Sequence, residues 1–264
     1  DINTKEEAKS AFSKMDADGR GMVLLTEWCD YLKEAEIDRK TGLGKLLSGN
    51  LVVKSFSSPN ERKRANKRTA QASPKQDKSK GLAVLVAGVY RAGTSSSLEL
   101  DDFISVFQPF AEETPVGHTH RHDAFVNADA NGNGMCSLAE IETFIKRSLV
   151  RAFRGDKGDR IFCRFRPCFI RAFNAAKALQ PSDVDQDKDV NYDDYVTFSE
   201  FRVLNAYLCI YAGMFDAFYK IDNSGKEADG DHDKRISQSE WLARFADVRD
   251  CGFVGLEDIN TKEE

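Results

Sequence analysis

The chain has 264 residues, of which 41% are hydrophobic and 31% charged, a composition typical of a globular protein of about one or two domains. No stretch reaches the roughly 18 consecutive apolar residues that a membrane-spanning helix needs, so the sequence predicts no transmembrane segment. The six cysteines follow no disulfide framework, which favours reduced thiols and a cytoplasmic location. We recognise no catalytic triad, phosphate-binding glycine loop or pair of hydrolytic acids, and we therefore expect no enzymatic activity.

The two ends of the sequence are identical over seven residues. Residues 1–7 and residues 258–264 both read Asp-Ile-Asn-Thr-Lys-Glu-Glu, and a chance match of this length is negligible. We interpret the chain as one copy of a tandem repeat, whose copies would bury faces against one another. The alternative is that the second heptapeptide is artificial.

Residues 16–27 have the pattern of an EF-hand loop, in which two helices flank a calcium-binding segment of 12 residues. Oxygen ligands take positions 1, 3, 5, 7, 9 and 12, glycine makes the turn at position 6, and an apolar residue at position 8 pairs with a partner loop. Arg20 stands at position 5 and has no lone pair to give, so calcium occupancy of this loop is left open. The ligand positions of this loop offer three carboxylates and one backbone carbonyl, from Asp16, Asp18, Met22 and Glu27.

A basic segment follows this hand. Residues 41–81 carry ten Lys and Arg against two acids, although the net charge of the whole chain is −5. Such a run is either a solvated linker or a contact for an acidic surface, such as a tubulin tail, an acidic lobe or anionic lipid. Nucleic acid is disfavoured as a partner, because no aromatic residue interleaves the charges.

Residues 82–117 have the rhythm of two helices around a loop that begins at Arg91 and offers no cation site. We favour an ordinary helical hairpin over a degenerate EF-hand. His118, His120 and His122 alternate, and they form either a mobile hinge before a helix, which we favour, or a zinc or nickel site.

Residues 129–140 are the best match to the EF-hand pattern, reading D-A-N-G-N-G-M-C-S-L-A-E. Gly134 makes the turn and Cys136 takes the apolar position. Apolar residues at helical spacing flank the loop on both sides. The predicted ligands are Asp129, Asn131, Asn133, the carbonyl of Met135, Ser137 and Glu140. Residues 151–171, which follow, mix arginine with phenylalanine and predict a helix between hands with a basic outer face.

Two more loops follow the same pattern, and each departs from it at the glycine position. Residues 189–200 have Asp194 there, and residues 229–240 have Lys234. Asp tolerates positive φ better than most residues, whereas Lys costs something in the turn. The predicted ligands of the first loop are Asp189, Asn191, Asp193, Tyr195, Thr197 and Glu200, and those of the second are Asp229, Asp231, Asp233, Arg235, Ser237 and Glu240, with Tyr195 and Arg235 contributing backbone carbonyls.

Segments outside the loops carry a family resemblance. Residues 172–179 read A-F-N-A-A-K-A-L, and residues 198–204 read F-S-E-F-R-V-L, leading through a run of apolar residues to Tyr219 and Asp222. With the first hand after residue 122, these segments resemble the calflagins, the flagellar calcium-binding proteins of trypanosomes. Residues 8–31 resemble the last hand of that family.

The resemblance implies an all-α fold of four EF-hands in two lobes, with short two-stranded β contacts between loops. Loops 129–140 and 189–200 would form one lobe, and loop 229–240 would pair with the 16–27 hand of the next repeat copy. We divide the chain into an EF-hand that pairs across copies (1–36), a basic linker (37–81), a helical hairpin or degenerate hand (82–117), a first EF-hand lobe (118–205) and a third hand with the repeat junction (206–264).

These patterns predict a calcium-binding repeat unit of a cytoskeletal or flagellar filament, with Mg²⁺ as a competing cation. The partners would be neighbouring copies, together with an acidic cytoskeletal surface or a target helix. The alternative is a soluble calcium buffer or a sensor that binds target helices. An enzyme regulated by EF-hands would need a catalytic domain elsewhere.

Overall fold

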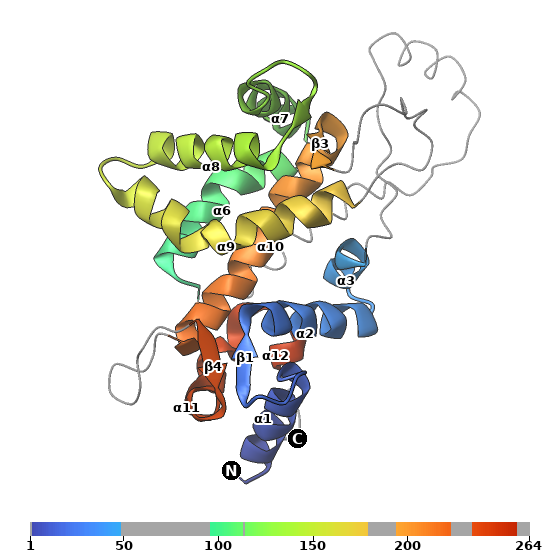
Figure 1. Cartoon of the computed structure of the whole chain (residues 1–264), viewed down its shortest axis with the longest axis vertical. Helices are drawn as coiled ribbons and strands as arrows, with labels where there is room; N and C mark the ends of the chain where they lie inside the picture. The colour runs from blue at the N-terminus through green and yellow to red at the C-terminus, as the bar shows by residue number, and fades with distance from the viewer. Residues whose placement is uncertain (1, 49–95, 113, 179–193, 223–233, 258–264) are drawn as a thin grey trace, which may run out of the picture.

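The computed structural model shows an all-α fold with two small antiparallel sheets, as the sequence predicted (Figure 1). The basic run 61–68, the helix expected before Arg91 and the second heptapeptide lie outside the described residues. The structure describes residues 2–48, 96–112, 114–178, 194–222 and 234–257.

Helix–strand–helix units carry the four loops, and we number these hands I to IV in chain order. Hand I consists of α1 (Ile2–Met15), β1 (Met22–Leu24) and α2 (Leu25–Asp38). Hand II consists of α7 (Pro115–Ala128), β2 (Met135–Cys136) and α8 (Leu138–Ala152). Hand III has α9 (Lys157–Lys177), β3 (Val196–Thr197) and α10 (Phe198–Asp222), and hand IV uses the end of α10, then β4 (Arg235–Ser237) and α11 (Gln238–Val248).

The hands pair through their strands into two lobes. Strand β2 pairs with β3, with Cys136 opposite Val196, so hands II and III form one lobe. Strand β1 pairs with β4, with Val23 opposite Ile236, so hands I and IV form the other. These four side chains stand at position 8 of their loops and are at most 1% exposed.

The pairing of hand I differs from the expectation that it needs a neighbouring copy. The sequence argument was that a lone hand leaves an apolar face unburied. The structure buries that face within one chain, because hands I and IV, from opposite ends of the sequence, meet across the β1–β4 ladder. Trp28 and Trp241 are both fully buried in the resulting core, with ring centroids 6.1 Å apart.

Helix α10 belongs to both lobes. It is 25 residues long, which corresponds to about 38 Å, and it runs through the molecule as the orange rod of Figure 1. Its first turn contains Glu200, the last ligand of loop III, and its last turn leads to loop IV. Nearly all of its side chains are buried, because helices of both lobes cover it. None of the described helices is both long and apolar enough to cross a membrane.

Helix α6 (Leu98–Ala111) lies outside the four hands and packs against α7, α8 and α10. It is the second helix of the expected 82–117 hairpin; the first lies outside the described residues. The boundary drawn at residue 117 falls inside α7, because Thr114 caps that helix and Pro115 begins it.

The histidines do not form a hinge, and that prediction is wrong. They lie within α7, where the rings of His118 and His122 pack edge-on against Phe198, each with its centroid 5.9 Å away. The prediction of a helix between hands within 151–171 is confirmed in part, because α9 begins at Lys157. It buries Phe162, Phe165 and Phe169 and exposes Arg160 and Arg166.

Short helices complete lobe I/IV. Helix α3 (Gly42–Leu47) and helix α12 (Val254–Glu257) both pack on α2, and the short helix η2 (Arg249–Cys251) connects α11 to α12. The buried carboxylate of Glu36 holds them together, since it accepts hydrogen bonds from Thr41 and from the backbone N of Val254, the latter at 3.0 Å. Gly44 is required at its position, because a Cβ there would lie 2.0 Å from the Glu36 carbonyl oxygen.

Candidate metal centres

Loop II is held by hydrogen bonds between its predicted ligands and its own backbone. The Asp129 carboxylate accepts hydrogen bonds from the backbone N of Asn133 (3.1 Å) and of Gly134 (2.8 Å), and the side-chain oxygen of Asn131 accepts a second bond from Asn133 N (2.9 Å). Asn131 Nδ2 also reaches Glu140 Oε1 at 3.1 Å. The structure therefore brings together residues from positions 1, 3, 5 and 12, and Gly134 makes the turn at φ 80°.

The ligand at position 12 of loop II also builds the helix that follows. Glu140 Oε2 accepts hydrogen bonds from the backbone N (2.9 Å) and hydroxyl (2.8 Å) of Ser137, which is the N-cap of α8. This capping box fixes the carboxylate at the loop mouth. A cation bound there would therefore act directly on the first turn of α8.

Loop I repeats three of the internal hydrogen bonds of loop II. The Asp16 carboxylate accepts from the backbone N of Arg20 (3.0 Å) and of Gly21 (2.8 Å), and Asp18 accepts from Arg20 N at 3.1 Å. Within the described chain, Asp16, Asp18 and Glu27 form a metal-competent acidic group whose ligand atoms all lie within 4.8 Å of one another.

Loop I differs from loop II in what its position 5 offers. Asn133 keeps its side-chain oxygen inside loop II, where it accepts from Met135 N at 2.9 Å. Arg20 instead places its guanidinium 3.2 Å from the Asp18 carboxylate, with 78% of the arginine side chain exposed. The backbone of loop I is thus shaped to bind a metal ion, but the guanidinium of Arg20 is already paired with Asp18, one of the predicted ligands.

Only the second halves of loops III and IV lie within the described residues. The first three predicted ligands of each loop lie outside them: Asp189, Asn191 and Asp193 in loop III, and Asp229, Asp231 and Asp233 in loop IV. In the described halves, the last ligands repeat the arrangement of loop II. Glu200 Oε2 accepts from the N and hydroxyl of Thr197 (both 2.8 Å), and Glu240 Oε2 accepts from the N (2.8 Å) and hydroxyl (2.7 Å) of Ser237.

The glycine positions of these two loops behave differently from each other. Lys234 has a φ of 63°, so it adopts the left-handed conformation that the loop demands despite its side chain. Asp194 does not, because Lys40 and Lys234 are the non-glycine residues with positive φ in the described parts of the chain. Asp194 lies instead 3.8 Å from the ammonium of Lys177 on α9, as an ion pair.

Burial separates Glu200 from the other last ligands. Its side chain is 3% exposed, and this burial raises the pKa of its carboxyl, while hydrogen bonds from Thr197 act in the opposite direction. Burial of a carboxylate is costly unless a charge partner is present. A divalent cation in loop III would supply that partner.

The contacts of two tryptophans beside the loops were not predicted from the sequence. Trp28 and Trp241 each follow directly after position 12 of their loops, and the indole Nε1 of Trp28 donates to the carbonyl of Met214 on α10 at 2.8 Å. The sequence signal was their shared position, since Ile141 and Phe201 stand at the same place in hands II and III and all four are fully buried.

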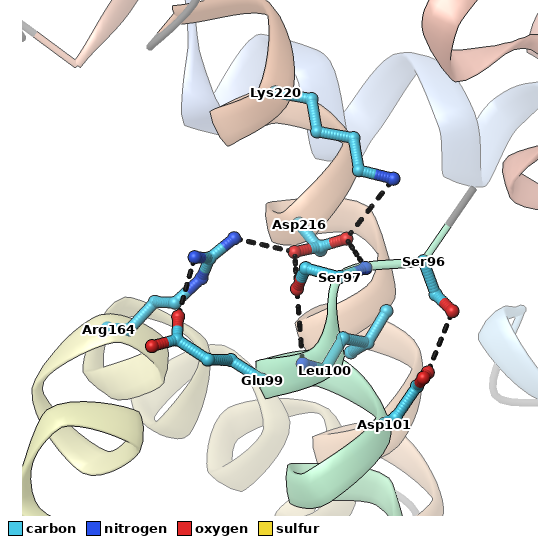
Figure 2. Close-up of polar contacts among 8 residues, drawn as sticks. All are labelled: Ser96, Ser97, Glu99, Leu100, Asp101, Arg164, Asp216 and Lys220. Carbon is cyan, nitrogen blue, oxygen red and sulfur yellow. Dashed lines mark hydrogen bonds and ion pairs between the residues drawn. The ribbon is translucent and has the colours of Figure 1, made fainter. Parts of the chain in front are cut away.

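The sequence analysis also did not predict a buried polar cluster on α10 (Figure 2). The carboxylate of Asp216 is 1% exposed and accepts hydrogen bonds from the hydroxyl (2.5 Å) and N (3.1 Å) of Ser97 and from Arg164 Nη2 (2.7 Å). Lys220 lies 3.6 Å away, one turn further along α10. In the sequence Asp216 only interrupted an apolar run, and nothing there indicated its partners.

The donor set of these loops fits calcium. It consists of carboxylate, amide, hydroxyl and carbonyl oxygens, which are the ligands of hard cations that accept six to eight oxygens. Imidazole and thiolate are absent from the predicted sets, and Cys136 turns into the core at 0% exposure. The geometry of loops I and II therefore supports calcium rather than zinc.

Comparison with known proteins gives the same assignment. Residues 106–208 match the family model of the FCaBP EF-hand domain, that of the flagellar calcium-binding protein. The match runs from within α6 to within α10 and contains loops II and III. No curated protein and no solved structure matches the chain. The chain is thus similar to this family over its central part and has an EF-hand domain of the calcium-binding type, which is typically non-enzymatic.

Proposed function

We propose that the protein is a calcium-responsive structural repeat unit of a cytoskeletal or flagellar filament, without catalytic activity of its own. The observation that carries the proposal is the heptapeptide shared by residues 1–7 and 258–264, combined with the two pairs of hands between them. In a tandem array, the sequence that starts one copy recurs directly after that copy ends.

Both ends of the described chain lie in the same lobe. Helix α12, the last described helix, packs on α2, so the described chain ends in lobe I/IV, where α1 also begins. Each copy closes its own lobes through the β1–β4 and β2–β3 ladders. Neighbouring copies would therefore contact each other through the surfaces of folded units. The sequence had instead predicted that a hand of one copy pairs with a hand of the next.

A scaffold and a sensor differ in how their apolar surface responds to calcium, because a sensor presents a continuous apolar groove to a target helix when calcium binds. In this structure, the large exposed hydrophobic residues of the described chain are spread over β1, α6, α7, α8 and α9, as Met22, Leu24, Leu98, Val116, Val126, Val150 and Ile170.

The location and partners follow from the same reasoning. The match to a flagellar calcium-binding family supports a flagellar or cytoskeletal place in the cytoplasm. The basic segment within residues 41–81 would contact an acidic surface there, such as the acidic tails of a filament protein. Calcium would alter the contacts between copies by reorienting the helices of each lobe.

Electron microscopy of the intact protein, with and without calcium, tests this proposal. We expect strings of globular units whose spacing changes when calcium is chelated. Single globular particles at every calcium concentration would contradict the structural role and leave calcium buffering as the function.

A further inference from the structure

Calcium in one lobe should influence the other, because both lobes use α10. One turn of this helix carries the contacts to both sides. On one side, the Met214 carbonyl accepts a hydrogen bond from Trp28 of hand I, and Phe218 packs against the Trp28 ring with centroids 6.0 Å apart. On the other side of this turn, Asp216 binds α6 and α9.

The Asp216 cluster joins three helices at one carboxylate (Figure 2). Ser97 caps α6 and gives both its hydroxyl and its backbone N to Asp216, so the start of α6 is held on α10. Arg164 of α9 bridges Asp216 and Glu99 of α6, at 2.7 and 2.6 Å. A charge that is 1% exposed cannot lose these partners cheaply, because no water replaces them.

The helices in this cluster are the ones that calcium would move. Helix α9 precedes loop III and α10 follows it, so a cation in this loop would change the angle between them if the hand opens on binding as calcium-responsive EF-hands do. Arg164 on α9 also stacks over Tyr219 of α10, with its guanidinium carbon 4.7 Å from the ring centroid. A change in the α9–α10 angle must therefore carry Asp216 with it or break its contacts.

We propose that Asp216 is a positioning residue that couples the two calcium lobes. By clamping α9 and α6 to α10, it transmits a change at loops II and III to the turn that holds Trp28. The proposal deepens the calcium-responsive function proposed above and rests on it. Couplings of this kind typically change affinity by about 5-fold to 150-fold.

The tryptophans allow a direct test. The chain has two, Trp28 and Trp241, and both lie in lobe I/IV, so tryptophan fluorescence of the full chain reports on that lobe alone. Calcium is titrated into four chains: the unmodified protein, Glu140→Gln, Asp216→Asn and the double variant. Glu140→Gln disables loop II of the other lobe, which is joined to loop III by the β2–β3 ladder.

We expect Glu140→Gln to shift the calcium midpoint of the tryptophan signal at least fivefold in the unmodified background and less than twofold in the Asp216→Asn background. A purely structural role would change stability but leave the shift equal in both. Equal shifts, or no shift in either, would overturn the proposal. If calcium leaves the tryptophan signal unchanged in every chain, the calcium sites of lobe I/IV fail, and with them the proposed coupling.

Two matched controls separate coupling from general damage. Glu36→Gln also neutralises a buried carboxylate, but it lies at the α2–α3–α12 junction and should leave the coupling intact. If Asp216→Asn does not fold, Ser97→Ala removes one donor to Asp216, and Thr114→Ala is its control, because it loses an equivalent helix cap without contacting the cluster. Ser97→Ala should then weaken the coupling and Thr114→Ala should not; the reverse result would overturn the proposal.

Discussion

Replacing Arg20 by Asn should convert loop I into a calcium site comparable to loop II. The substitution gives loop I the residue that loop II has at the same position, where Asn133 already holds its oxygen inside the loop. The backbone should accept the change without rearrangement, because the N atoms of Arg20 and Asn133 make the same bonds to the first two ligands of their loops.

The size of the gain follows from two terms. Arg20 must release Asp18 before calcium can bind, and an ion pair with 78% and 38% exposed side chains contributes about 0.5 kcal/mol. A guanidinium about 5 Å from a divalent cation repels it by about 1.7 kcal/mol in water. Together these terms predict a gain of about 2 kcal/mol, or roughly 30-fold in affinity, before the new ligand oxygen is counted.

The assay is a calcium titration followed by the fluorescence of Trp28, which comes directly after the last ligand of loop I. Glu240→Gln serves as the background, because it disables loop IV of the same lobe. Arg160→Asn is the control, since it removes an exposed arginine from α9, outside the four loops. A midpoint within twofold of the background value would refute the reasoning that Arg20 limits this site.

Three further outcomes follow from the structure. Trp28→Phe should lower the free energy of unfolding by about 2 kcal/mol, measured by urea denaturation, because it removes the 2.8 Å bond to Met214 and leaves a cavity. Lys234→Gly should tighten calcium binding at loop IV by about 0.5–1 kcal/mol in calorimetry, since it relieves a φ of 63°. Burial raises the pKa of Cys29 and Cys209 from 9.0 to about 12, so the folded state keeps protons that the unfolded state loses above pH 9. Below pH 9 these thiols should not affect the free energy of unfolding. Between pH 9 and 12 each thiol should lower it by about 1.4 kcal/mol per pH unit, measured by denaturation at a series of pH values. Replacing either cysteine by serine should reduce this dependence on pH.

The local pattern of hands I and II could be predicted from the sequence, because the place of each ligand is fixed by its position in a 12-residue loop. The prediction of Val23 and Ile236 at position 8 was equally secure, although their pairing within one chain was not. Residues more than 200 positions apart met, and nothing in the local pattern distinguishes a hand of the same chain from that of another copy.

The polar contacts between helices could not be predicted at all. Asp216 contacts Ser97, which is 119 positions away in the sequence, and Arg164, which is 52 positions away. Separations of this kind leave no periodic signal in the sequence. The histidines of α7 were misjudged for a related reason. Their alternation allowed a metal site and we favoured a hinge instead, whereas Thr114 caps a helix that contains all three histidines, and two of their rings pack against Phe198.

Isothermal titration calorimetry of the full chain with calcium, in the presence of magnesium, tests the central claim most directly. Four EF-hands in two lobes predict three or four sites, and the site in loop I should appear or strengthen in the Arg20→Asn chain. A stoichiometry of one or none would contradict the account and leave the two lobes as a scaffold without a calcium response.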